Sequence, residues 1–245
     1  MAFRPFAAVA SIVFLAFVPP SAPAAEPERP PVPRAAVGVV EMADRAICSG
    51  VVVAPDVVLT AAHCLFDEDD QPARVRRFRA GVEKGHARAE AKVVDHFIPE
   101  GFDPRRFMDT DEIDSLDWAF LRLDRSIGEA TGVLPVRVLS EDEFDRLKPG
   151  GGWSFAQVGY GHGDGRNPAV LTGCRIVEWW DDQTYAHDCG TVAGDSGSPN
   201  LLLEDGVYKV IGIESAEADL NRVEGADMVV ASGAFAGALA HYLRR

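Results

Sequence analysis

The 245-residue sequence has few cysteines, a deficit of basic residues and, beyond its N-terminal segment, no long apolar run. None of its four cysteines forms a C-x-x-C pair, which disfavours a zinc site. It has 24 Lys and Arg against 38 Asp and Glu, giving a net charge of −14. A surface this acidic disfavours nucleic acid and anionic membranes as partners. Without a later apolar stretch of spanning length, we expect no membrane segment in the mature protein.

The N-terminal segment has the pattern of an export signal. Arg4 precedes an apolar stretch over residues 6–18, and small residues follow at 22–24. This pattern predicts a signal peptide over residues 1–25 and a secreted or periplasmic protein; an uncleaved membrane anchor is the alternative. The proline-rich residues 26–36 are expected to be a leader or propeptide without a core of its own.

From residue 37 onward, short β-branched runs alternate with turn residues. Runs such as VGVV, VVLTAA and WAFLRL, and later YKVIGIES and DMVVAS, have the length and spacing of antiparallel strands in a barrel or sandwich. Ser140 followed by Glu143 predicts a short capped helix in SEDEFDRLK. Apolar residues recur at helical spacing in 232–245, which predicts a closing amphipathic helix.

In an exported protein, an even number of cysteines indicates disulfides. Three pairings are possible. The most local one joins Cys48 to Cys64 and Cys174 to Cys189, and each bridge would contribute about 3 kcal/mol in the chain-entropy model.

Three stretches contain residue types suited to catalysis: VVLTAAHC at 57–64, LDWAFLRL at 116–123 and GTVAGDSGSPN at 190–200. Taken singly, His63 could be a core histidine, Asp117 a strand cap and Ser196 part of a polar turn. The acidic runs at 67–70 and 109–114 lack the spacing of a calcium loop and are predicted to be solvated.

Together, TAAHC, D-x-A-x-L-R-L and GDSGSP, in the order His, Asp, Ser, resemble the trypsin-like (chymotrypsin-fold) serine peptidases. VGYGHG at 158–163 and VIGIES at 210–215 support the resemblance, and CGTVAGDSGSP is more similar to the bacterial and glutamyl-endopeptidase branch. The resemblance implies an all-β fold of two antiparallel six-stranded Greek-key barrels with the active site between them. The implied units are residues 37–139, residues 140–231 and a C-terminal helix at 232–245.

The resemblance also implies an exported serine endopeptidase acting through an acyl-enzyme on protein or peptide substrates. His63 would be the general base, Asp117 its orienting partner and Ser196 the nucleophile, with the amides of Gly194 and Ser196 as the oxyanion hole. We expect no metal, no cofactor, no membrane association after signal removal and a monomer. Alternatives are a catalytically silent binding protein of the same fold, or a serine esterase, whose G-x-S-x-G normally lies on an α/β chain.

The implied substrate pocket departs from the best-known patterns. Trypsin's pocket aspartate is replaced by Gly190, and the histidine that glutamyl endopeptidases carry in GIH is replaced by Glu214, although Thr191 matches that branch. We hypothesise that Glu214 or Glu217 favours a basic or polar substrate side chain; the alternative is that both face solvent. The candidate pocket residues are Gly190, Thr191, Glu214, Ser215 and Glu217.

Activation is a separate question. In much of the family, a newly cleaved amino terminus pairs with the aspartate that precedes the serine, here Asp195, and cleavage between Arg34 and Ala35 would provide one. Only 13 positions separate Ala35 from Cys48, so Asp195 could instead be satisfied by another cation or by backbone amides. The remaining histidines have no ligand spacing and are predicted to be surface or packing residues: His86, His96, His162, His187 and His241.

Overall fold

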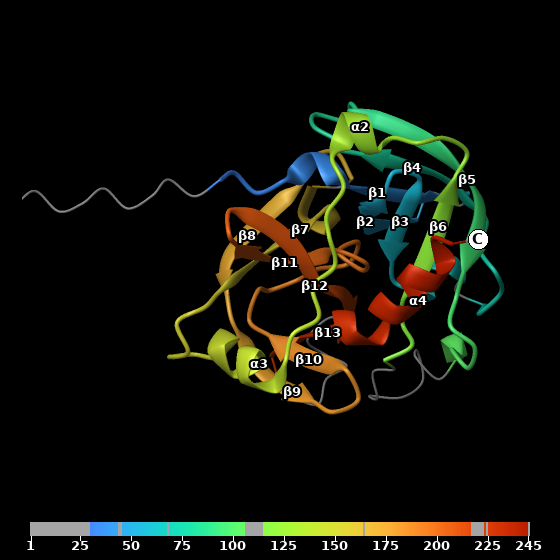
Figure 1. The fold of residues 1–245 in the computed structure, drawn as a ribbon. Coiled ribbons are helices and arrows are strands. Elements are labelled where there is room, and N and C mark those ends of the chain that lie inside the picture. Colours follow the sequence, from blue (N-terminus) through green and yellow to red (C-terminus); the bar gives the residue numbers. More distant parts are fainter. Residues whose placement is uncertain are drawn as a thin grey trace, which may run out of the picture.

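A computed structural model shows two β-sheets side by side (Figure 1). The described residues are 30–43, 46–67, 69–105, 115–163, 165–216, 223 and 225–244. The predicted signal peptide, the acidic run at 109–114 and Glu217 lie outside this part of the chain. No helix in the described part is long and apolar enough to cross a membrane.

The first sheet is a closed antiparallel barrel in the order β1-β2-β3-β6-β5-β4. Its strands alternate as a barrel requires: in VRRFRA, Phe78 and Ala80 are buried inside while Arg77 and Arg79 lie on the outer face. The strands are β1 (Val37–Met42), β2 (Ile47–Ala54), β3 (Val57–Thr60), β4 (Val75–Ala80), β5 (Ala89–Phe97) and β6 (Ala119–Leu123).

The second sheet curls into a half-barrel in the order β8-β7-β11-β12-β13-β10-β9. It has seven strands where the sequence predicts six. The edge strands β8 and β9 are separated only by Arg175, and the left-handed φ of 81° at Gly173 lies just before the corner between them. The strands are β7 (Phe155–Gly159), β8 (Ala169–Cys174), β9 (Ile176–Trp180), β10 (Thr184–His187), β11 (Pro199–Glu204), β12 (Val207–Ala216) and β13 (Asp227–Ala231).

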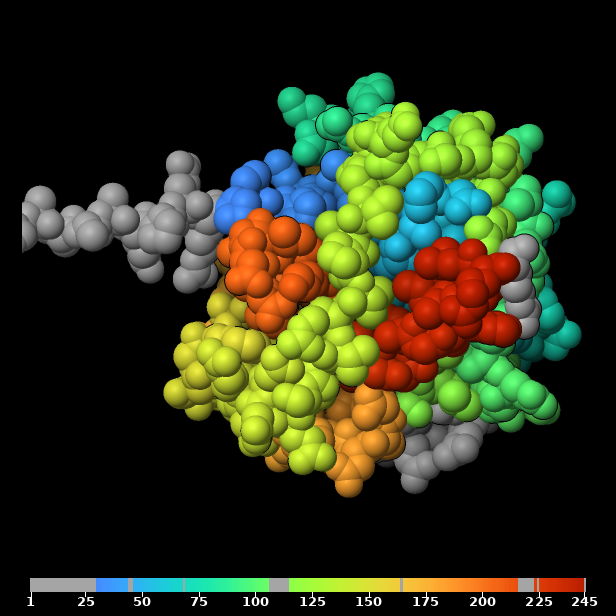
Figure 2. Space-filling model, in the orientation of Figure 1, coloured from blue at the N-terminus to red at the C-terminus, as the bar shows by residue number. Residues whose placement is uncertain are grey.

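Helices are few and short. The predicted capped helix is confirmed as α3 (Glu141–Leu147), with the reciprocal Ser140 and Glu143 hydrogen bonds of a capping box. Together with α2 (Gly128–Thr131), it lies on the connection that crosses the face of the molecule from the first sheet to the second (Figure 2). Single 3₁₀ turns are η1 (Arg34–Ala36), η2 (His63–Leu65), η3 (Gly161–Gly163) and η5 (Ser232–Ala234).

The predicted closing helix is confirmed as α4 (Ala236–Tyr242), shorter than the predicted range because residues 232–234 form the 3₁₀ turn η5. Tyr242 packs its ring against Phe97 and Phe120 of the first barrel, and the Arg122 guanidinium lies 4.7 Å from its centroid. The chain that ends the second sheet therefore returns to cover the first barrel (Figures 1 and 2).

A buried tyrosine ties the two sheets together. The Tyr160 hydroxyl, just after β7, accepts the amide of Val82 at 2.8 Å and lies 3.3 Å from the carbonyl oxygen of Val37. Burial raises the pKa of this phenol to about 12, so it stays neutral. Because Tyr160 belongs to the second half and its partners to the first, its hydroxyl links the two halves of the molecule.

Both predicted disulfides are present, Cys48–Cys64 and Cys174–Cys189, and no cysteine is free. Donor atoms of Cys48, His63 and Cys64 lie within 4.8 Å of one another. The two sulfurs are bonded to each other, so they are not thiolate ligands and this group is not a metal site.

Candidate active site

His63 and Asp117 are brought together by strand pairing. His63 begins η2 just after β3, and Asp117 lies just before β6; β3 and β6 are antiparallel neighbours with Thr60 opposite Ala119. The end of one strand therefore lies beside the start of the other. The Nδ1 atom of His63 is 2.8 Å from Oδ2 of Asp117, and the backbone amide of His63 donates to Oδ1 at 2.8 Å.

The Asp117 carboxylate is fully buried yet well satisfied. Besides the two bonds from His63, it accepts the Ser215 hydroxyl at 2.5 Å, and its side chain has 0% exposure. These three donors offset the desolvation of the charge. With Nδ1–H directed at the carboxylate, Nε2 of the partly exposed imidazole carries the lone pair and lies 3.8 Å from Cys64 Sγ.

Ser49 on β2 holds the loop that contains Ser196. Its amide donates to the Ser196 carbonyl at 2.8 Å, and its hydroxyl donates to the Gly194 carbonyl at 2.9 Å. The neighbouring residue, Cys48, is joined by its disulfide to Cys64, which follows His63. A short path of covalent and hydrogen bonds therefore connects the nucleophile loop to the histidine.

The glycines of this loop are required by its geometry. Gly197 has φ = 80°, and a Cβ atom there would lie 2.3 Å from the Ser49 carbonyl oxygen and 2.4 Å from Thr60 Oγ1. Gly194 has φ = 97°. Neither the amide of Gly194 nor that of Ser196 has an acceptor within the described part of the chain. The two amides therefore remain candidates for the predicted oxyanion hole.

Asp195 is satisfied inside the second half of the molecule. Its carboxylate accepts the amides of Gly161 at 2.8 Å and Val192 at 3.2 Å, and Nε2 of His162 lies 3.8 Å away. Burial raises the pKa of Asp195, and the two amides partly oppose that shift. Ala35, the residue considered for an activation pairing, lies instead in η1 beside Gly81 of the first barrel.

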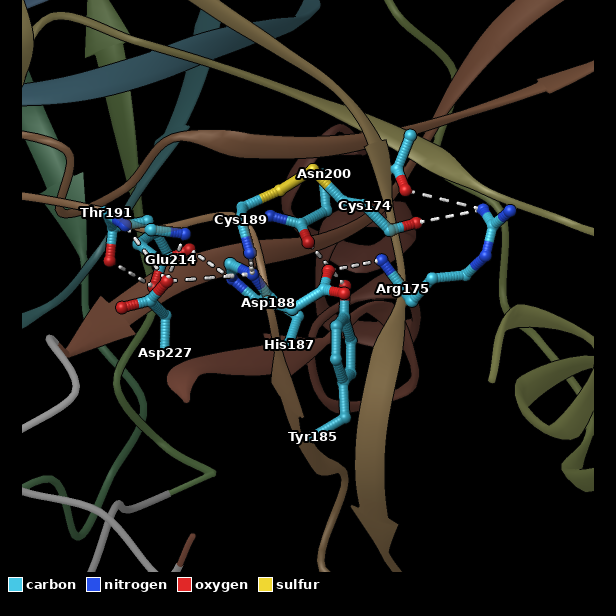
Figure 3. Close-up of a disulfide and its surroundings, with 12 residues drawn as sticks. Cys174, Arg175, Tyr185, His187, Asp188, Cys189, Thr191, Asn200, Glu214 and Asp227 are labelled. Carbon is cyan, nitrogen blue, oxygen red and sulfur yellow. Dashed lines mark hydrogen bonds and ion pairs between the residues drawn. A yellow bond between two sulfur atoms is a disulfide. The ribbon is translucent and has the colours of Figure 1, made fainter. Parts of the chain in front are cut away.

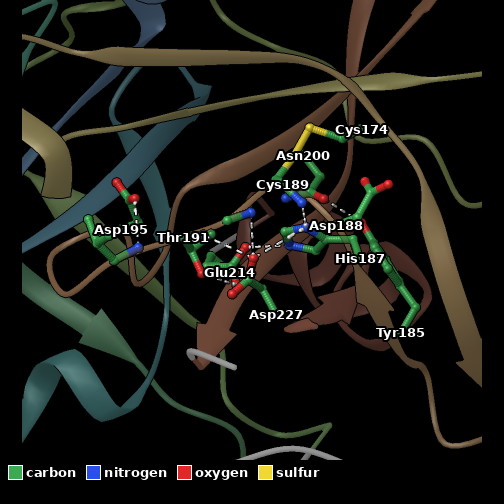
Figure 4. A network of polar contacts seen from close by, with 12 residues as sticks. Cys174, Tyr185, His187, Asp188, Cys189, Thr191, Asp195, Asn200, Glu214 and Asp227 are labelled. Atoms are coloured by element: carbon green, nitrogen blue, oxygen red, sulfur yellow. Dashed lines mark hydrogen bonds and ion pairs between the residues drawn. A yellow bond between two sulfur atoms is a disulfide. The ribbon is translucent and has the colours of Figure 1, made fainter. Parts of the chain in front are cut away.

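Glu214 on β12 lies beside the nucleophile loop and its side chain is buried. Its carbonyl accepts the Gly197 amide at 2.8 Å, and its amide donates to the Ser198 carbonyl at 2.9 Å. The side chain is only 2% exposed, so the alternative that Glu214 faces solvent is wrong. Its Oε2 is 2.8 Å from Nε2 of His187, and its Oε1 is 3.5 Å from the Thr191 hydroxyl (Figure 4). Burial raises the pKa of Glu214 to about 7.

Asp227 completes this polar cluster. Its Oδ2 accepts the amides of Gly190 at 2.8 Å and Thr191 at 2.9 Å, and it lies 3.9 Å from Nδ1 of His187. The Cys189 amide donates to the same Nδ1 at 3.1 Å, close to the Cys174–Cys189 disulfide (Figure 3). The disulfide therefore anchors the chain at Cys189, directly before the candidate pocket residues Gly190 and Thr191.

The folded chain groups the candidates into two sets. His63 and Asp117 meet with Ser215, whereas Gly190, Thr191 and Glu214 meet around residues that the sequence did not single out. The sequence predicts His187 to be a surface or packing residue. It does not point to Asp227, to Ser49 or to the contact between His162 and Asp195. No local motif marks them, because His187 and Asp227 become neighbours only through the β10–β13 register.

Comparison with known proteins identifies the fold. A family model described as a trypsin-like peptidase domain matches residues 48–213. The chain belongs to the trypsin-like peptidase family. It is a serine endopeptidase of that family, and the recognition made from its sequence motifs is confirmed.

Solved structures agree with this fold. A glutamyl endopeptidase in complex with MPD matches with a TM-score of 0.68 and 16% identity, covering 87% of this chain and 92% of its own. A thermostable serine protease, AL20, from an extremophilic microorganism matches with a TM-score of 0.65 and 17% identity. This match covers 86% of this chain and 97% of AL20. Protease Anisep from Arthrobacter nicotinovorans matches with a TM-score of 0.63 and 16% identity, and the match covers 85% of this chain and 97% of that protease. A comparison with curated proteins finds no match.

Proposed function

We propose that this trypsin-like peptidase is exported and cleaves peptide bonds through an acyl-enzyme on Ser196. The observation that carries the proposal is the fully buried Asp117, which orients His63 through Nδ1 while it also accepts the Ser215 hydroxyl. Such an aspartate fixes the imidazole tautomer and stabilises the imidazolium that forms during the reaction.

The reaction proceeds in two halves. His63 Nε2 takes the Ser196 hydroxyl proton as Oγ bonds to the substrate carbonyl carbon, and the carbonyl oxygen becomes an oxyanion. The amides of Gly194 and Ser196 bind that oxygen. His63 then protonates the leaving amine, and the C–N bond breaks to leave an ester on Ser196. Water, deprotonated by His63, attacks the ester carbon. The bond between that carbon and Ser196 Oγ then breaks, His63 returns the proton to Oγ, and the carboxylic acid is released.

Maturation requires only removal of the signal peptide, residues 1–25. Asp195 already has the Gly161 and Val192 amides, with His162 nearby, so the loop before Ser196 can be ordered without a new amino terminus. We therefore expect full activity from protein that begins at residue 25 or 26. Amino-terminal sequencing of active secreted protein checks this, and activity appearing only when the chain starts at Ala35 would contradict it.

A fluorophosphonate probe tests the function directly. Wild-type protein is expected to label once, on Ser196, and Ser196→Ala to show no labelling while keeping its melting temperature. His63→Ala is expected to slow labelling by about 10³-fold or more, because the base is lost. Folded wild-type protein that neither labels nor cleaves a casein or mixed-peptide substrate would instead identify a silent binding protein of this fold.

A further inference from the structure

A cluster of buried ionisable side chains lies beside the nucleophile loop and takes no part in the chemistry proposed above. It contains three carboxylates and one imidazole, from Asp195, Glu214, Asp227 and His187, each with a side chain no more than 4% exposed. No Lys or Arg side chain in the described part of the chain lies within ion-pair distance of any of these carboxylates. With three carboxylates and one imidazole, the cluster has an excess of negative charge once Glu214 is ionised.

The hydrogen bonds of His187 show that it does not neutralise this charge. Its Nδ1 accepts the Cys189 amide, which places the ring proton on Nε2, directed at Glu214. Burial lowers the pKa of His187 and the neighbouring carboxylates raise it by more, but the Cys189 amide occupies the position that a second proton would take. The imidazole is therefore neutral, and its Nε2–H donates a hydrogen bond to the carboxylate of Glu214.

The cluster connects to the surface through the segment before Ser196. Gly190 is exposed with φ = 75°, and a Cβ atom added there would meet no atom within 4 Å. Thr191 is half-buried, and its hydroxyl contacts Glu214 Oε1. Thr191 therefore links the buried Glu214 carboxylate to the exposed backbone at Gly190.

The donors in this region are already used by the protein's own acids. The Thr191 hydroxyl and His187 serve Glu214, and the amides of Gly190 and Thr191 serve Asp227. A substrate carboxylate would find no free donor among them and would be repelled. An apolar side chain would further desolvate the carboxylates without supplying a cation.

We propose that Glu214, supported by His187 and by the charge of Asp227, binds a positively charged side chain, lysine or arginine, on the substrate residue that precedes the cleaved bond. This inference rests on the proposed function, since it assigns the substrate class of the same site. Glu214 is a specificity residue and does not take part in bond cleavage.

The preference for a basic residue depends on pH because only ionised Glu214 attracts a cation. The groups that face it are His187 on β10, Asp227 on β13, and Asp195 and Thr191 in the nucleophile segment; Asp188 acts on His187 from the far side and Tyr185 is a neutral phenol. With a Glu214 pKa of about 7, the ionised fraction increases about tenfold between pH 6 and pH 8. The substrate lysine remains charged throughout this range.

The test compares two peptides that differ only in lysine or glutamine before the cleaved bond. The ratio of their kcat/KM values cancels any effect of pH on the catalytic residues, because these residues act on both peptides. For wild type we expect a ratio of about 10² at pH 8, falling about tenfold at pH 6. In Glu214→Gln the ratio should approach 1 and lose its pH dependence. The matched control Glu129→Gln, at an exposed position on α2, should behave as wild type.

Two further measurements separate this proposal from the proposed function. Wild-type protein that labels with the fluorophosphonate probe but shows no preference for the lysine peptide would overturn this assignment and leave the proposed function standing. In Ser196→Ala, calorimetry with N-acetylated peptides that end in lysine or glutamine should show tighter binding of the lysine peptide, lost when Glu214→Gln is added. Equal affinity of Ser196→Ala for both peptides, a wild-type preference for acidic or apolar residues, or an unchanged ratio in Glu214→Gln would overturn the assignment.

Discussion

Replacing Glu214 by glutamine should stabilise the folded protein at alkaline pH. The pKa of Glu214 is raised from 4.5 to about 7 by burial, so the folded state holds this proton more tightly than the unfolded chain does. Stability is therefore lost as pH rises from about 4.5 to about 7, and above this range the loss is about 3 kcal/mol. Glutamine removes the charge and can keep both contacts, since its carbonyl can accept from His187 and its amide can donate to Thr191.

We therefore expect Glu214→Gln to exceed the parent by up to about 3 kcal/mol at pH 8 and by much less at pH 5. Urea denaturation followed by tryptophan fluorescence measures this difference, with both proteins in the Ser196→Ala background to prevent self-digestion. The raised pKa of Asp195 is common to both proteins and cancels. A variant no more stable than its parent at pH 8, or a difference independent of pH, would refute the reasoning. The expected trade of stability for substrate binding is typical of functional sites.

Three other substitutions test the framework around the nucleophile. Gly197→Ala should reduce kcat/KM by at least about 10²-fold, because the added methyl group meets the Ser49 carbonyl oxygen. The control Gly206→Ala has a similar φ of 77° but faces open space. It should cost only about 1–2 kcal/mol of stability and leave activity unchanged. Ser49→Ala should cost about 1–3 kcal/mol and slow fluorophosphonate labelling, because it removes a buried hydroxyl bonded to the loop; normal labelling would contradict that role. Replacing Cys48 and Cys64 together by serine should lower unfolding free energy by about 3 kcal/mol, measured by denaturant titration without reductant, whereas an unchanged midpoint would show that the bridge adds nothing.

Local patterns in the sequence were sufficient for the catalytic motifs and most of the architecture. The stretches containing His63, Asp117 and Ser196 each have a distinctive composition, and their order along the chain identifies the family. The helix capped by Ser140 and the closing helix were predictable because capping and amphipathic spacing involve residues only a few positions apart. For the four cysteines, three pairings were possible, and the most local of them is the one that the structure contains.

The number of strands in the second sheet was less predictable. The family resemblance implies six strands here, whereas the structure has β8 and β9 as separate strands on the two sides of a corner near Gly173 and Arg175. Only the pairing of β8 with β7 and of β9 with β10 shows that the chain turns there. Register is a property of two segments and cannot be read from one.

By itself, the sequence determined the family, the order of the catalytic residues and the acidic character of the chain, because each of these depends on residue identity and short-range spacing. Only the tertiary structure decided that Glu214 is buried, that His187 serves it as a neutral donor, and that Asp195 is satisfied by Gly161 and Val192. The physical reason is that burial and hydrogen-bond partners depend on which distant segments pack together, and these two factors set the charge of a side chain.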